Sequence, residues 1–178
     1  MITFAVSGCS VHPDQQISCD TRHRSIFLLE AQAVPSATFV PCVEPLPAGW
    51  SYGGHLIRSG SVRFWLNSDR VGSHAVEITL TPTCDLSAAK PSSPFVYVAG
   101  LRRYEEPTSR RPYASVSYHV FPGGCVTSRL SFTRQAMPVI FDEASHALGF
   151  TPRSVYVNGV RDDEGLTLCG AEAPGCPG

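Results

Sequence analysis

The sequence contains few charged residues and almost no lysine. Asp, Glu, Lys and Arg account for 16% of the 178 residues, and Lys90 is the only lysine among the 14 basic side chains. The formal net charge of -1 is far from the dense positive field that non-specific binding to nucleic acid requires, so we exclude nucleic acid as a partner. The bias towards arginine is typical of a GC-rich bacterial genome and carries no information about mechanism.

Long apolar runs are also missing. No stretch reaches the roughly 18 consecutive apolar residues of a membrane-spanning helix. Residues 4–10, FAVSGCS, nevertheless resemble the end of a bacterial lipoprotein signal peptide, whose cysteine becomes lipidated. Residues 1–6 carry no charge and are too few to direct export by themselves. We therefore expect a truncated start, with a lipid on Cys9 or an upstream membrane helix; the alternative is a short strand at 2–6 with Cys9 bridged or free.

The cysteines lack the spacing of a metal or redox motif. No pair is arranged as C-x-x-C, and the long, irregular intervals between the seven cysteines are typical of disulfides formed in an oxidising compartment. If Cys9 carries a lipid, an even set remains that can form three bridges, although the sequence does not choose their connectivity. The predicted disulfide cysteines are Cys19, Cys42, Cys84, Cys125, Cys169 and Cys176. The histidines show no ligand spacing either, so we predict no metal and no cofactor.

Recognisable catalytic motifs are absent. The sequence has no G-x-S-x-G elbow, phosphate-binding loop or dinucleotide fingerprint, which favours a non-enzymatic protein. The weak catalytic candidates lie in DEASHALGF, where Asp142 and His146 are four residues apart and Glu143 is adjacent. We expect all three on one helical face, where they could act as an acid–base group of a hydrolase. The alternative is a solvated polar face with a weak ion pair.

Alternating apolar residues predict several strands. The pattern is clearest at 62–66 and 76–81, joined by a loop at 67–73, and at 113–121 and 126–132, joined by a Pro-Gly-Gly turn. Further strands are expected at 38–40, 95–98, 155–157 and, more weakly, 166–169. We expect loops or linkers at 41–54, 87–94 and 102–112, where proline, glycine or charged residues are frequent.

One segment is typical of a helix. Pro138 occupies a first-turn position, apolar residues follow at helical spacing, and Gly149 ends the segment. Many strands and few helices predict a mainly β fold, an antiparallel sandwich or open barrel with one or two short helices, stabilised by disulfides; an α+β fold is the second choice. Residues 1–24 are expected to form a tether or a first strand and loop. Residues 25–178 form a single domain or two sub-lobes, 25–90 and 95–178.

Two groups of residues are candidates for ligand binding. The first is Trp50, Tyr52 and His55, which we expect in a loop where exposed aromatic rings could stack on a sugar or peptide; alternatively, Trp50 closes one end of the core. The second lies in RRYEEPTSRR, whose arginines could grip an anionic glycan or the carboxylates of a partner. These are Arg102, Arg103, Arg110 and Arg111. The alternative for this segment is a self-neutralising solvent loop.

Together these features favour a non-enzymatic, extracytoplasmic domain of the cell envelope or a secreted protein. We expect it to bind an envelope protein or glycan, and to meet a membrane only through a tether at or before Cys9. One alternative is a secreted hydrolase that uses Asp142 and His146. The other is the ligand-sensing domain of a truncated membrane protein.

Overall fold

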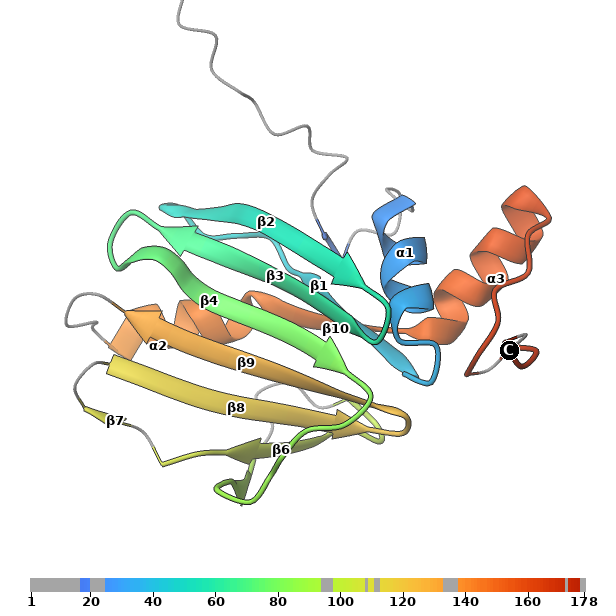
Figure 1. The fold of residues 1–178 in the computed structure, drawn as a ribbon. Coiled ribbons are helices and arrows are strands. Elements are labelled where there is room, and N and C mark those ends of the chain that lie inside the picture. The colour runs from blue at the N-terminus through green and yellow to red at the C-terminus, as the bar shows by residue number, and fades with distance from the viewer. Residues whose placement is uncertain are drawn as a thin grey trace, which may run out of the picture.

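The fold is built around one large antiparallel sheet, shown in the computed structural model of the protein (Figure 1). The structure describes residues 17–19, 25–93, 98–107, 109–110, 113–132, 138–171 and 173–176. Seven strands follow the hydrogen-bonded order β2-β3-β4-β9-β8-β6-β5, and β7 also pairs with β8. The strands are β2 (Trp50–Arg58), β3 (Ser61–Ser68), β4 (Gly72–Thr81), β5 (Lys90–Ser92), β6 (Arg102–Glu105), β7 (Ser109–Arg110), β8 (Tyr113–Phe121) and β9 (Gly124–Phe132).

A smaller layer covers one face of this sheet. Strands β1 (Phe39–Val43) and β10 (Leu148–Pro152) form an antiparallel pair, and helix α2 (Pro138–His146) leads directly into β10. In Figure 1, α2 and the β1-β10 pair lie behind the large sheet, while α1 (Ser25–Ala33) and α3 (Arg153–Glu164) stand together beyond one end of it. In the described part of the chain, no helix is long and apolar enough to cross a membrane.

The core lies between the two layers. Alternate side chains of β3 and β4 point towards the smaller layer and are fully buried, as the period of two in their sequences predicts. These residues are Val62, Phe64, Leu66, Val76, Ile78 and Leu80. Burying side chains of this size contributes about 1.5–3 kcal/mol each, so this half of the sheet holds the layers together.

The predicted mainly β, disulfide-stabilised fold is confirmed. Both expected hairpins form, β3-β4 and β8-β9, and α2 begins at the predicted Pro138. The described residues contain three short helices where one or two were expected. The division of residues 25–178 into sub-lobes stays a prediction. Most of residues 1–24 and of the strand expected at 95–98 lie outside the described residues.

The strand predicted at 155–157 is wrong, because these residues belong to helix α3. Three residues with high strand propensity stand together there, which suggested a strand locally. The buried positions along α3 are instead Arg153, Tyr156, Val157 and Val160, the spacing of one helical face. Packing of that face in the core therefore outweighs the local propensity. The weak strand expected at 166–169 is not formed either.

The expected loops are shorter than predicted. Of residues 41–54, only 44–49 lie outside strands, because β1 extends to Val43 and β2 begins at Trp50. The linker expected at 102–112 contains strand β6, which pairs with β8. The linker expected at 87–94 contains the three-residue strand β5. Charged and proline-containing segments thus form the outer strands of the sheet.

All six predicted disulfide cysteines are paired. The bonds are Cys19–Cys42, Cys84–Cys125 and Cys169–Cys176. The first ties the segment before α1 to β1, and the second ties the segment after β4 to β9. Cys9 lies outside the described residues.

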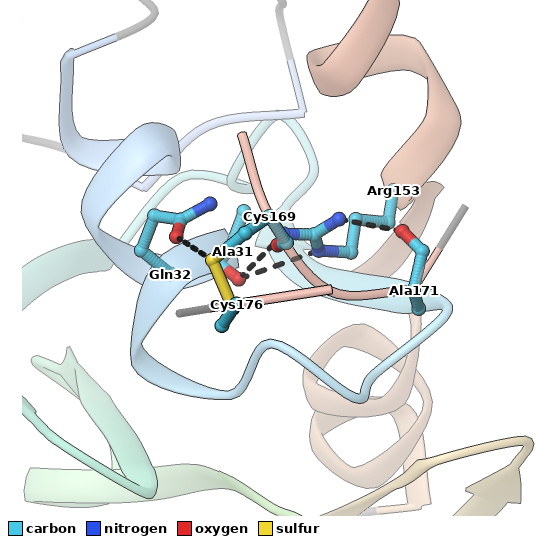
Figure 2. The surroundings of a disulfide bond; sticks show 6 residues. All are labelled: Ala31, Gln32, Arg153, Cys169, Ala171 and Cys176. Atoms are coloured by element: carbon cyan, nitrogen blue, oxygen red, sulfur yellow. Dashed lines mark hydrogen bonds between the residues drawn. A yellow bond between two sulfur atoms is a disulfide. The ribbon is translucent and has the colours of Figure 1, made fainter. Parts of the chain in front are cut away.

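The third bond closes a short loop against α1 and α3, shown in Figure 2. The fully buried guanidinium of Arg153 donates hydrogen bonds to three backbone carbonyls around it. Its nitrogen atoms lie 2.5 Å from the oxygen of Cys169, 2.6 Å from that of Ala171 and 3.3 Å from that of Ala31. The loop therefore supplies two of the acceptors that make burial of this cation tolerable.

Candidate binding cavity

Strand β8 has the unusual property that its polar side faces the covered side of the sheet. Ser115, Ser117 and His119 line a cavity beneath α2 and β10, while Tyr118 points to the opposite face. An amphipathic strand normally turns its apolar residues towards the covering layer. The reversal here means that the space above β8 is not filled by apolar side chains.

The neighbouring strands extend this polar surface. Arg103 on β6 is paired in register with His119 on β8, and Glu105 is paired with Ser117. Ser117 is in turn paired with Ser128 on β9. Side chains paired in this way have Cβ atoms about 4.5–5.5 Å apart, so these five residues form one continuous patch. We call this patch, together with Ser115, the cavity floor.

The cavity above this floor has a volume of about 270 Å³. Phe141, Asp142 and Ser145 of α2 and Leu148 of β10 form its roof, and Leu130 completes the wall on β9. The roof is thus partly apolar, while the floor is polar throughout. A concave space with convergent polar groups is typical of small-molecule sites, although this lining is more polar than most.

Arg103 is buried in the floor and paired with Glu105. Its side chain is only 7% exposed, and it makes an ion pair with the carboxylate of Glu105. Nη2 of Arg103 makes this ion pair, and Nη1 donates a hydrogen bond to the carbonyl of Ser93 at 3.0 Å. The hydroxyl of Ser92 donates to the second oxygen of Glu105 at 2.9 Å. Burial lowers the pKa of Arg103, and the nearby carboxylate offsets part of that effect.

His119 is held mainly by packing. Its ring lies 5.0 Å from the ring of Phe150, and its Nδ1 atom is buried without a hydrogen-bond partner among the described residues. Burial, followed by the positive charge of Arg103, lowers the pKa of His119 to about 4. The imidazole is therefore neutral at pH 7 and offers one donor and one acceptor.

The three catalytic candidates lie within about 100° around α2, as the predicted shared face requires, but their side chains have different partners. Asp142 and His146 are mostly exposed, with Oδ1 and Nδ1 3.4 Å apart, and only Asp142 borders the cavity. Glu143 follows Asp142 immediately and so points about 100° away around the helix. It accepts a hydrogen bond from Nε1 of Trp50 at 2.8 Å and forms an ion pair with Arg70.

The contacts of Glu143 fix α2 to the sheet. The hydrogen bond from Arg70, then that from Trp50, holds the pKa of Glu143 below its usual range. Arg70 also donates to the carbonyl of Ala48 at 3.4 Å. Glu143 therefore links the helix that carries the roof to the start of β2 and to the β3-β4 turn.

The aromatic candidates lie away from the cavity floor. Trp50 is 8% exposed and belongs to the core, so the expectation of an exposed stacking ring there is wrong and the alternative of a core plug fits. Tyr52 and His55 are half-buried on β2, with Oη and Nδ1 3.1 Å apart. Burial lowers the pKa of His55. Neither residue borders the cavity.

The arginine candidates are separated by the alternation of β6. Arg103 enters the floor, whereas Arg102 is exposed on the other side of the strand. Arg110 lies in β7, and Arg111 is outside the described residues. The expected self-neutralisation takes place between Arg103 and Glu105, although on a strand rather than in a solvent loop.

Sequence reasoning missed most of the floor. Its serines and His119 stand on the polar side of alternating strands, which is assigned to solvent by default. One available signal was Ser128, which interrupts the otherwise apolar series Val126, Leu130 and Phe132 on β9. The described residues contain no group of three His, Cys, Asp or Glu side chains able to hold a metal ion.

Comparisons of this chain with protein-family models, curated proteins and solved structures found no significant match.

Proposed function

We propose that this protein is an extracytoplasmic binding domain that receives a polar group of an envelope glycan or protein in the cavity between the sheet and α2. One observation carries the proposal: the polar side of β8, with Ser117 and its neighbour Arg103 more than nine-tenths buried, faces an open space. Burying polar groups costs free energy unless they gain partners, so their concentration around a cavity is evidence of a ligand.

The location outside the cytoplasm is supported by the disulfides. Three disulfide bonds pair all six cysteines that lie in the described residues. Such bonds persist in oxidising compartments and are rare in the reducing cytosol. The envelope or the extracellular space is therefore the favoured setting.

Binding is favoured over hydrolysis by the placement of the acid–base candidates. His146 is 56% exposed and does not border the cavity, and Glu143 is engaged with Trp50 and Arg70. Catalysis would require a base within hydrogen-bond reach of a bound substrate. Of the predicted acid–base residues, only Asp142 borders the cavity, and most of the remaining polar lining consists of hydroxyl groups and the Arg103–Glu105 ion pair, which suit recognition.

The test is a nuclear magnetic resonance screen of the oxidised, isotope-labelled protein against a library of small soluble glycans and polar fragments. We expect at least one compound to shift the backbone amide signals of β8 and α2. The Ser117→Leu variant fills the floor and should abolish those shifts. Ser131→Leu is the matched control, because Ser131 is exposed on the outer side of β9.

Ser115→Leu provides a second variant, since Ser115 is less buried than Ser117 and tolerates a larger side chain more easily. Melting temperatures of all three variants establish that each is folded. Binding that survives both cavity-filling variants, or shifts confined to segments away from β8 and α2, would contradict the proposal.

A further inference from the structure

We propose that the ligand unit that enters the cavity is neutral and rich in hydroxyl groups, about the size of one sugar ring, rather than an anion. This inference rests on the proposed function and names the class of its ligand. It follows from the charge of the cavity, its hydroxyl groups, the apolar residues of its roof and its size.

The charge of the cavity disfavours an anion. Within the described lining, Arg103 is the only permanent cation, and its charge is compensated by Glu105. Asp142 adds a second carboxylate at the roof. His119 contributes no charge at pH 7, because burial lowers its pKa to about 4. An incoming carboxylate or phosphate would therefore meet a net negative site without an available cation.

The hydroxyl groups of the floor suit a polyol. Ser115, Ser117 and Ser128 make no side-chain hydrogen bond to other described residues, yet each hydroxyl can donate one bond and accept two. A hydroxylated ligand can satisfy all three serine hydroxyls, because its own hydroxyls also donate and accept. An apolar ligand would leave them unsatisfied.

The carboxylate of Asp142 fits the same class. It is 66% exposed and lies at the roof, where it can accept hydrogen bonds from ligand hydroxyls. Charge-assisted bonds of this kind are stronger than those between neutral groups. The same carboxylate would repel an acidic sugar.

The roof supplies an apolar surface for the carbon face of a ring. Phe141 is held in place by an edge-to-face contact with Phe132, with ring centroids 4.8 Å apart. Leu130 and Leu148 continue this surface. A volume of about 270 Å³ lies just below the usual range of about 300–1,000 Å³ for ligand sites and is suited to one ring.

The test compares matched sugars by amide chemical shifts at pH 7. The neutral probes are methyl glucoside, methyl galactoside, methyl mannoside and N-acetylglucosamine; glucuronate and galacturonate are their acidic counterparts. We expect a neutral probe to shift the signals of β8 and α2, and its uronate to bind about fivefold more weakly or worse. Asp142→Asn changes an exposed side chain and removes its charge, so the difference in affinity between the neutral sugar and its uronate should become smaller.

The outcomes separate the inference from the proposed function. If a uronate or a divalent cation binds more tightly than every neutral sugar, and Ser117→Leu abolishes that binding, the ligand class is wrong while the cavity remains the site. If no neutral probe shifts the cavity signals, the inference also fails. The fragment screen then decides the proposed function independently.

Discussion

Arg103 and His119 lie directly opposite each other on β6 and β8, with a buried cation beside a half-buried neutral ring. This arrangement makes the fold sensitive to acid. Burial, with a contribution from Arg103, places the pKa of His119 at about 4 in the folded protein, below the usual value for histidine of about 6.5. Between these values the unfolded chain binds a proton that the folded chain does not.

The first prediction concerns stability between pH 4 and pH 6.5. Because the folded pKa of His119 is depressed, its contribution to the free energy of unfolding is complete above about pH 6.5 and is lost as the pH falls towards 4. His119→Gln should remove on the order of 2 kcal/mol of this loss. Urea unfolding at several pH values measures it. Ser117→Ala, which alters the same floor without a titrating group, should keep the wild-type slope, and an equal slope in His119→Gln would contradict the assignment.

Glu30 has the opposite dependence on pH. Its carboxyl is fully buried in α1 with no hydrogen-bond partner among the described residues, and burial raises its pKa well above the usual range. A raised folded pKa contributes stability at low pH that is lost as the pH increases through that pKa.

Glu30→Met is therefore expected to be more stable than the wild type at pH 8, by about 1–3 kcal/mol, with the difference shrinking towards pH 4. Thermal and urea unfolding at both pH values provide the comparison. Glu164→Met at the exposed end of α3 is the control and should change stability by less than about 0.5 kcal/mol. A destabilised Glu30→Met at pH 8 would show that the carboxylate has a stabilising role.

Strand β8 shows how much of the structure could be predicted from the sequence. Its alternation predicted the strand and its hairpin partner correctly, because a period of two is a local property. It did not predict which side faces the cavity, because both sides carry a buried residue: Tyr118 and Ser117 are each 6% exposed, on opposite faces. Only the course of α2 and β10 over the sheet decides that one side borders a cavity.

Arg103 and α3 illustrate two further limits. The RRYEEPTSRR segment has the composition of a solvent loop, and pairing with β8 makes its first residues a strand. Val155, Tyr156 and Val157 have strand propensity, and packing against the core makes them helical. In both cases contacts between segments distant in the sequence outweigh local preference. The disulfide partners likewise depend on which strands become neighbours, which the cysteine spacing does not encode.

The loop closed by Cys169–Cys176 should depend on Arg153 for its contribution to stability. Replacing both cysteines with serine removes a bond that closes a short loop, at an expected cost of about 2–3 kcal/mol. The same loop presents the carbonyls of Cys169 and Ala171 to the buried guanidinium of Arg153. Loosening the loop therefore also weakens the hydrogen bonds that stabilise the buried charge of Arg153.

A double-mutant cycle separates the two effects. If the carbonyls matter, losing the bond should cost less in the Arg153→Met background than in the wild type, as measured by urea unfolding. Arg161→Met, on the exposed side of the same helix, is the matched control and should leave the cost unchanged. Strict additivity in the Arg153 cycle would mean that the disulfide acts through chain entropy alone.

Glu143 is predicted to control ligand affinity without bordering the cavity. Glu143 belongs to α2, the helix that carries the roof residues Phe141, Asp142 and Ser145. Its carboxylate joins that helix to Trp50 and Arg70. Glu143→Ala removes both links, whereas Glu143→Gln keeps an acceptor for the Trp50 indole and loses the ion pair. Affinity for a cavity ligand should therefore fall in the order wild type, Gln variant, Ala variant.

Amide chemical shifts of α2, recorded with the affinities, distinguish a displaced roof from a general loss of stability. A displaced roof changes signals along residues 139–146 even where the protein is fully folded, and it raises the dissociation constant in proportion. Asp162→Ala removes an ion pair with Arg161 on the exposed surface of α3, away from the cavity, and should affect neither quantity. Unchanged affinity in Glu143→Ala would show that packing of Phe141 against Phe132 is sufficient to hold the helix over the floor.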